Sequence, residues 1–425
     1  MLRLNIIILI TLTFVINGTI CAEILFEKKE YPIVGWPRGS PLIDYSIMSN
    51  DGNGKSKIAV LCSIPEDRIK GLIITLSADR GEVVEEIFDT REKLDHITAV
   101  DLNHDGNPEI FCDSFFDPNS MAYAKKDGEW IRIDLPYPNL WHSIHVWFDY
   151  NKDGWPDLFF KGDVLEPDNN IPHKYDNKGT TIKLYENVKG KLVPTNITFA
   201  ISGSVDSAQA IDINMDGYDD LIIYPHISKS FIALATHLYL NDGNTLKELE
   251  NPVVLKDKVI PLSFGYASVG DINGDGKPDL VISGFRYFTL QNRNQLTVTY
   301  QNISKDNKRI LYNYSEYTDI VPDMTTFKIV DLDKDGWNDI IGGSSCQHGS
   351  LYGERRNITL LHNDKGKLVL QPDLLENFYG KSKKSIIYID IDGDGLLDLL
   401  CIPSSSNKPF MILHNKSKTN KEDIK

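Results

Sequence analysis

The stretch "DINGDGKPDL", from Asp271 to Leu280, decides the fold of this chain. Its positions 1, 3, 5 and 9 are Asp271, Asn273, Asp275 and Asp279, and position 6 is glycine. Asp, Asn and Gly also make ordinary turns, because they tolerate left-handed backbone angles and bond their own backbone. Calcium, however, takes six to eight oxygen ligands, and an EF-hand loop begins with the same alternation and the same glycine. The stretch is therefore either a plain hairpin turn or a loop that wraps a cation.

The same pattern recurs in six copies at a mean spacing of about 58 residues, which is in the range of a repeated supersecondary unit. Position 9 is acidic in every copy, although a plain hairpin requires nothing special of a residue that already enters the next strand. We therefore interpret the loops as about six structural Ca²⁺ sites. The predicted ligands are Asp101, Asn103, Asp105, Glu109; Asp149, Asn151, Asp153, Asp157; Asp212, Asn214, Asp216, Asp220; Asp271, Asn273, Asp275, Asp279; Asp331, Asp333, Asp335, Asp339; and Asp390, Asp392, Asp394, Asp398.

The flanks of each loop predict β-strands. Short runs of β-branched and apolar residues, such as "FKIV" before a loop and "LVIS" after one, are typical of buried strands and too short for helices. Each repeat has room for two further strands, and "TIKLYEN", "HLYLND" and "ITLLHND" are candidates. Four strands per unit, repeated around a channel, make an all-β fold, the β-propeller.

A degraded seventh loop occurs at "SNDGNGKSKIAVLC". If Gly54 takes position 6, Ser49 takes position 1 and Lys57 takes position 9. A cation then replaces the carboxylate that should enclose the metal, so we expect a turn without calcium. The chain is predicted to be a seven-bladed β-propeller.

The two ends of the chain predict how the propeller closes. After Asp390 only one strand pair and one more strand, "FMILHN", fit before the polar tail. An N-terminal strand near Glu23 to Tyr31 has no blade of its own. We expect it to complete the last blade as its outer strand, which would cover an edge that otherwise invites aggregation.

The loops and the stretch "FGYASVGDINGDGKPDLVISG", from Phe264 to Gly284, resemble the FG-GAP/VCBS repeat family, which includes the heads of integrin α subunits. The resemblance implies the propeller fold, calcium at the six loops and a role in adhesion or ligand binding. No leg domains or C-terminal membrane helix accompany the repeats. A fold of this kind hosts many functions, so the resemblance indicates the scaffold more strongly than the activity.

Charge and composition limit the classes of partner that the chain is expected to bind. The net charge is −15, from 60 acidic and 45 basic residues, and 20 of the acids occupy ligand positions in the loops. The excess acid is therefore concentrated in the predicted metal sites, and six bound Ca²⁺ ions would bring the charge close to zero. Neither a basic stripe nor an aromatic RNA-binding motif occurs, so nucleic acid is not an expected partner.

The first 22 residues, "MLRLNIIILITLTFVINGTICA", have the features of a secretory signal peptide. We expect residues 1–22 to be removed, 23–414 to form the propeller and 415–425 to form a polar tail. The mature chain is then secreted, or periplasmic in a bacterium, without a membrane span. Of its four cysteines, Cys62, Cys112 and Cys401 follow the loops where a small buried residue is needed, which favours free thiols over disulfides.

The ligand is expected on the face opposite the calcium loops, where long connections gather. The candidate ligand-binding residues are Trp141, His142, Arg286, Tyr287 and His348. His145 is interpreted as a solvated side chain and not as a general base. Catalytic residues cannot be named, because nucleophile elbows, zinc signatures and phosphate loops do not occur.

Two functions are compatible with this chain. The first is a secreted, calcium-stabilised module that binds or adheres to an extracellular glycan or protein. The alternative is a lyase-like propeller enzyme acting on polysaccharides, for which Arg286, Tyr287 and His348 could supply the required cluster. Binding is favoured over catalysis.

Overall fold

The computed structural model describes residues 15–16, 19–20, 24–50, 55–114, 119–163, 180–201, 205–225, 237–249, 263–285, 295–302, 312–316, 326–343, 358–372, 374, 386–401 and 410–417. These residues form strands and connecting turns, and no helix occurs among them. The chain divides into two compact units. One unit comprises residues 91–271 and 275–327, and the other comprises residues 1–90, 272–274 and 328–425.

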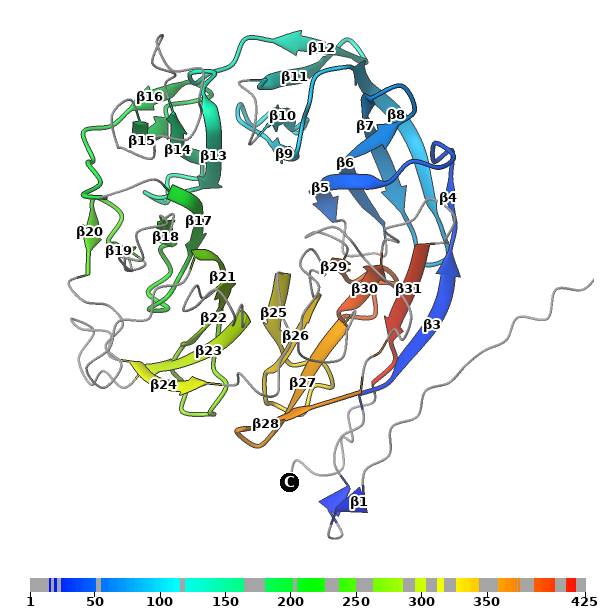
Figure 1. Ribbon diagram of the computed structural model, residues 1–425, viewed down its shortest axis with the longest axis vertical. Coiled ribbons are helices and arrows are strands. Elements are labelled where there is room, and N and C mark those ends of the chain that lie inside the picture. The colour runs from blue at the N-terminus through cyan, green and yellow to red at the C-terminus, as the bar shows by residue number, and fades with distance from the viewer. Residues whose placement is uncertain are drawn as a thin grey trace, which may run out of the picture. The chain divides into compact units, whose positions relative to one another are not determined.

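The unit of residues 91–327 contains four four-stranded antiparallel sheets, in each of which neighbouring strands follow one another along the chain (Figure 1). The first sheet is β9 (His96–Val100), β10 (Glu109–Asp113), β11 (Met121–Lys126) and β12 (Glu129–Ile133), and the second is β13 (Trp141–Phe148), β14 (Asp157–Asp163), β15 (Thr180–Asn187) and β16 (Leu192–Pro194). The third sheet is β17 (Val205–Ile211), β18 (Asp220–Pro225), β19 (His237–Asn241) and β20 (Leu246–Glu248), and the fourth is β21 (Ser263–Gly270), β22 (Asp279–Phe285), β23 (Gln295–Asn302) and β24 (Tyr312–Glu316).

The other unit contains three sheets. The first is β4 (Ile33–Val34), β5 (Leu42–Asn50), β6 (Ser56–Ile64), β7 (Arg68–Leu76) and β8 (Gly81–Thr90). The second is β25 (Thr326–Val330), β26 (Asp339–Gly343), β27 (Ile358–Asp364) and β28 (Lys367–Leu370), and the third is β29 (Ile386–Ile389), β30 (Asp398–Cys401), β31 (Phe410–Asn415) and β3 (Phe26–Tyr31). Inside the predicted signal peptide, β1 (Val15–Ile16) pairs with β2 (Thr19–Ile20).

These sheets confirm the strand pattern predicted around the acidic loops. Each loop joins the first and second strands of its sheet, and the second strands are almost wholly buried, as β10 and β30 illustrate. The three candidate third strands are β15, β19 and β27. The chain is all-β with the sheet organisation of a β-propeller.

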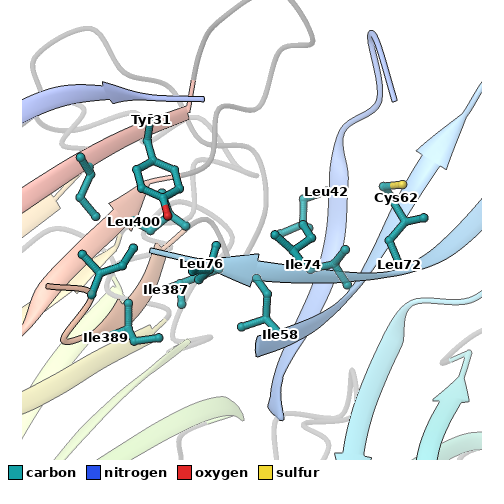
Figure 2. Close-up of a cluster of buried hydrophobic side chains, with 13 residues drawn as sticks. Tyr31, Leu42, Ile58, Cys62, Leu72, Ile74, Leu76, Ile387, Ile389 and Leu400 are labelled. Atoms are coloured by element: carbon teal, nitrogen blue, oxygen red, sulfur yellow. The ribbon is translucent and has the colours of Figure 1, made fainter. Parts of the chain in front are cut away.

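The N-terminal strand completes the last sheet, as predicted. β3 pairs antiparallel with β31 over six residue pairs, from Phe26 opposite Asn415 to Tyr31 opposite Phe410 (Figure 1). Tyr31 is 1% exposed, and it belongs to a core cluster that this sheet shares with the five-stranded sheet (Figure 2). In Figure 2, Ile387, Ile389 and Leu400 lie on one side of this cluster. The burial of apolar side chains from both ends of the chain stabilises the N-terminal strand in place.

The sheet of β4 to β8 has five strands where four were expected, because the two-residue strand β4 runs parallel to β8 and adds a fifth. The chain leaves β3 through Pro32 and passes along the edge of β8, and Gly81 donates its backbone N–H to the Pro32 carbonyl at 2.9 Å. This short pairing protects part of a ten-residue edge strand.

Residues 51–54 of the degraded loop lie outside the described residues. The two strands that flank this loop, β5 and β6, are described. Lys57 is exposed, whereas the residue at position 9 of the six acidic loops is at most 5% exposed. A register shift between Ile47 and Ser49 accompanies this difference. Lys57 therefore does not occupy the buried position that a ninth ligand takes elsewhere.

Within the described residues, no helix is long and apolar enough to cross a membrane.

Candidate functional site

All six acidic loops share one backbone conformation. The glycine at position 6 has a φ between +77° and +95° in every loop, which a residue with a Cβ atom rarely adopts. Position 4 is also left-handed, and in four loops it is not glycine: it is His104, Lys152, Met215 or Lys334. A left-handed non-glycine residue costs about 1–2 kcal/mol. The glycine position could be predicted from the sequence, but the strained fourth position could not.

The side chains at positions 1, 3 and 5 bond to the backbone of their own loop. In the loop of residues 149–157, Asp149 accepts the backbone N–H groups of Asp153 at 3.1 Å and Gly154 at 2.8 Å. Asp153 in turn accepts the N–H of Trp155 at 2.9 Å. The bond from the glycine N–H to position 1 recurs in the other five loops. An ionised carboxylate has about four acceptor sites, so oxygen lone pairs remain for a cation.

The carboxylate at position 9 ties two strands to the loop. Asp157 is wholly buried, and its oxygens accept the N–H of Tyr150 at 3.0 Å and the N–H of Asn187 at 2.7 Å. The same pair of bonds forms at Asp220, Asp339 and Asp398. These bonds satisfy buried donors and are a reason for an acidic residue that is independent of any metal. The backbone bonds therefore explain an acidic residue at position 9 even without a metal.

Burial makes these carboxylates costly to ionise. It raises the pKa of Asp157 and of Asp220 to about 7, although two backbone N–H groups favour the charged form of each. Burial, together with the neighbouring carboxylates of Asp335 and Asp339, also raises the pKa of Asp333 to about 7. A divalent cation among these oxygens would favour their charged form and remove that cost.

The carboxylates converge most closely in the last two loops. Within the described residues, oxygens of Asp331, Asp333 and Asp339 all lie within 4.8 Å of one another, and so do oxygens of Asp390, Asp392 and Asp394. Asp333 is 1% exposed, and its Oδ2 has no hydrogen-bond partner. These acidic groups could each hold a metal ion, since hard divalent cations prefer such oxygens.

An asparagine at the end of the third strand connects each of four loops to the loop of the preceding sheet. The side-chain amide of Asn363 donates to the Ile272 carbonyl, at position 2 of the preceding loop, at 2.8 Å. Asn187, Asn241 and Asn415 make the equivalent bonds to Leu102, Tyr150 and Leu332. This connection was not predicted, because the asparagines follow position 9 of their loops at different distances, from 17 to 30 residues.

Side chains at position 7 cover the preceding loop. The Trp155 ring stacks on His104, with centroids 4.0 Å apart and planes 7° apart. Trp337 lies over Gly274, where an added Cβ atom would approach its ring to 2.6 Å. Tyr218, at position 7 of its loop, makes the same kind of contact, because the Nζ of Lys152 in the preceding loop lies 4.5 Å from the centroid of its ring. Neighbouring loops within each unit are therefore packed against one another.

The proposed ligand-binding residues are only partly covered by the described residues. Trp141 and His142 begin β13, and their side chains lie outside the described part of the structure. Arg286, Tyr287 and His348 also lie outside the described residues. Their convergence stays a prediction.

His145 is buried, whereas the sequence was interpreted as placing it in solvent. Its side chain is 3% exposed, and its Nδ1 lies 2.9 Å from a carboxylate oxygen of Asp113, which is 5% exposed. The Tyr137 ring lies 4.5 Å from the His145 ring. Neither the His145 Nε2 nor the Tyr137 hydroxyl has a hydrogen-bond partner, and burial raises the pKa of Tyr137. The cluster could not be predicted from the sequence, because Asp113 ends β10 whereas His145 lies in β13 of the next sheet.

A buried lysine, Lys161, lies near the C-terminal end of β14. The Lys161 side chain is wholly buried, and its Nζ lies 3.0 Å from a carboxylate oxygen of Asp163. Both residues lie among the last three of β14, at the end of the strand that is remote from the acidic loop. Burying the Lys161 ammonium is costly without a partner, and the partly exposed Asp163 carboxylate supplies one.

The three cysteines within the described residues are buried and form no disulfide, as expected: Cys62, Cys112 and Cys401. Burial raises the pKa of the Cys62 thiol to about 12, so this thiol is not reactive at neutral pH. Cys346 lies outside the described residues.

Comparisons with known proteins agree with the loop geometry. The model of the FG-GAP repeat matches residues 267–295, and that of the FG-GAP-like repeat matches residues 331–408. These matches support the resemblance to FG-GAP repeats over the two matched segments. Among proteins of curated function, none matches the chain by sequence.

Among solved structures, an oligogalacturonate lyase in complex with manganese is similar, with a TM-score of 0.45, 9% identity and 96% of each chain covered. A GH43_1 enzyme from Xanthomonas citri is similar with a TM-score of 0.35 and 10% identity, over 83% of this chain and 97% of that one. Similarities of this size carry no conclusion about activity.

Proposed function

We propose that the chain is a secreted, calcium-stabilised β-propeller that binds an extracellular glycan or protein. The observation that carries the metal assignment is the common geometry of the six loops, in which side-chain oxygens at fixed positions surround a glycine turn. Two of these loops bring three carboxylates within reach of one ion. Loops of extracellular modules with this donor set typically bind calcium with a Kd of about 10⁻⁴–10⁻³ M.

The seven-bladed architecture belongs to this proposal. Apart from the β1–β2 pair, the described strands form six four-stranded sheets and one five-stranded sheet, and we interpret each as one blade. In a circular arrangement of blades, β3 would close the ring by pairing with β31. Calcium then has a structural role, because the position 9 carboxylates are buried in six of the seven sheets.

The ligand is proposed to bind at the strand ends remote from the acidic loops. Three buried titratable side chains occur there, Asp113, His145 and Lys161, and Lys161 pairs with the partly exposed Asp163. A purely structural sheet end has no need for such groups, which are costly to bury. Trp141, His142, Arg286, Tyr287 and His348 remain the proposed contacts with the ligand.

The alternative is an enzyme acting on polysaccharides, and one observation favours it. The Asp113–His145 pair leaves the buried His145 Nε2 without a hydrogen-bond partner, and the Tyr137 hydroxyl lies in the same cluster. A carboxylate that orients a histidine is a common arrangement in general acid–base catalysis. We rank this function second, because His145 is buried.

A glycan array tests these two functions. The mature chain is applied in millimolar calcium, and chelator-treated protein is the control. Calcium-dependent binding to one sugar class supports the binding module, and release of unsaturated sugar from a uronate polymer, lost in His145→Gln, supports the enzyme. A folded protein that binds no glycan would favour a protein as the ligand.

A further inference from the structure

The last two acidic loops differ from the others in a correlated way. Position 3 is asparagine in the first four loops, but it is Asp333 and Asp392 in the last two. The residue opposite position 9 on the third strand differs in the same two sheets, where the register places His362 opposite Asp339 and His414 opposite Asp398. In the other four sheets the register places Ala124, Glu186, Leu240 and Gln301 at this point.

The two histidines use their imidazoles differently. His362 Nδ1 lies 2.9 Å from Asp339 Oδ1, which is an ordinary hydrogen-bond distance. His414 Nδ1 lies 3.6 Å from Asp392 Oδ2 and 3.7 Å from Asp398 Oδ1, and it has no hydrogen-bond partner. Its side chain is only 5% exposed, so water does not readily satisfy this nitrogen. A buried nitrogen therefore points at two carboxylates without bonding to either.

This spacing matches the coordination shell of a small metal ion. Nδ1 of His414 and one oxygen each of Asp392 and Asp398 lie within 4.8 Å of one another. Metal–nitrogen and metal–oxygen bonds of about 2.0–2.2 Å place neighbouring ligand atoms roughly 3–4 Å apart. The 3.6 Å and 3.7 Å separations fall in that interval.

We propose that the loop of residues 390–398 is a mixed imidazole–carboxylate site that binds a divalent transition metal ion in preference to calcium. His414, Asp392 and Asp398 are its ligands, with Asp390 and Asp394 completing the acidic loop. Calcium takes oxygen ligands, whereas imidazole suits transition metals. The inference rests on the proposed metal binding by the loops and gives one of them a different ion.

Lys416 is the competing cation in this loop. Its Nζ lies 2.5 Å from Asp392 Oδ2 and 3.4 Å from Asp394 Oδ2. About a third of this side chain is exposed, so the ammonium can leave the carboxylates when an ion binds. Lys416 therefore lowers the affinity of the site and does not block it.

The test adds one equivalent of Mn²⁺ to the metal-free full-length mature chain in excess Ca²⁺. Electron spin echo envelope modulation then detects ¹⁴N coupling from a coordinated imidazole. We expect ¹⁴N modulation in the wild type and in His362→Gln, the matched control, and its loss in His414→Gln with a drop of about tenfold or more in Mn²⁺ affinity. Lys416→Met is expected to bind Mn²⁺ more tightly than the wild type, and it tests the site if His414→Gln does not fold.

Bound Mn²⁺ without ¹⁴N modulation, or modulation that persists in His414→Gln, overturns the histidine site and leaves metal binding by the loops intact. Mn²⁺ that calcium displaces from the wild type also overturns the preference. A chain that binds neither Mn²⁺ nor Ca²⁺ overturns the proposed function itself.

Discussion

The side-chain amide of Asn187 donates a 2.9 Å hydrogen bond to the carbonyl of Leu102, which lies 85 residues earlier in the chain and in the preceding sheet. The same amide group bonds to the Pro156 carbonyl, and the Asn187 side-chain oxygen accepts the N–H of Gly190 at 2.7 Å. One wholly buried side chain thus satisfies groups in two loops and one turn. We expect such residues to hold adjacent sheets in register within each unit.

Replacing Asn187 by alanine should lower the free energy of unfolding by about 2–3 kcal/mol, because buried carbonyl groups lose their donors. Urea unfolding in calcium buffer measures this loss. Asn244→Ala is the control, since Asn244 is exposed and should change stability by less than about 0.5 kcal/mol. Equal effects of the two substitutions would contradict the role given to Asn187.

Replacing Asp157 by asparagine should destabilise the protein even without metal. The amide NH₂ group would face one of the two N–H donors that the carboxylate now accepts, from Tyr150 and Asn187. A neutral side chain also escapes the desolvation that raises the pKa of Asp157, so we expect a net loss of only about 1 kcal/mol.

Asp153→Asn is the matched control for that experiment, because the asparagine keeps an oxygen to accept the Trp155 N–H and loses only the exposed bond from Asn151 Nδ2. In chelator its unfolding free energy should equal that of the wild type, whereas in calcium it should be lower. If both substitutions had no effect in chelator, position 9 would serve the metal alone.

Removal of calcium should lower the melting temperature. Calcium at about ten times its Kd stabilises the folded state by roughly 1.4 kcal/mol for each occupied site. Asp275→Ala should reproduce part of this loss in calcium and add little to it in chelator. Calorimetry of both proteins, with the exposed Asp364→Ala as control, measures these effects. A melting temperature that is unchanged in excess chelator would rule out a structural ion.

The pH dependence should change sign with calcium. Asp157 and Asp220 have pKa values near 7 in the folded chain, well above the ordinary value of 3.8. The metal-free folded state therefore holds protons that the unfolded chain has released, and its stability falls as pH rises from about 4 to 7. Calcium requires the deprotonated carboxylates, so the stabilisation it adds should grow over the same range.

Melting temperatures at pH 5, 6, 7 and 8 test this prediction, in calcium and after removal of divalent ions. The difference between the two curves should widen as pH rises. A metal-free protein that becomes more stable toward pH 8 would show that other groups dominate the titration.

The repeated loop made most of the fold predictable, because position 6 requires glycine and each loop lies between two apolar runs of strand length. The pairing of β3 with β31 followed from counting strands at the two ends. The fifth strand, β4, could not be predicted, since two residues carry no periodic signal and the pairing depends on where the edge of β8 lies.

The candidate sites were predictable only where they are local in sequence. The carboxylate and amide side chains at positions 1, 3, 5 and 9 lie within nine residues of one another, so their spacing is visible in the sequence. Asp113 and His145 are 32 residues apart and come together only through packing between sheets. The histidine opposite position 9 is similarly hidden, because finding His414 requires the register of β30 with β31.

The pairing of β3 with β31 has a consequence for biosynthesis. The residues of β3 leave the ribosome among the first of the folded chain, and their partner, Phe410–Asn415, among the last. At translation rates of about 5–20 residues per second, β3 waits roughly 20–80 s for its partner strand. A chain truncated before residue 410 would leave the edges of both β3 and β30 unpaired. The final sheet therefore forms only on a full-length chain, and an incomplete product would expose two strand edges to aggregation or proteolysis.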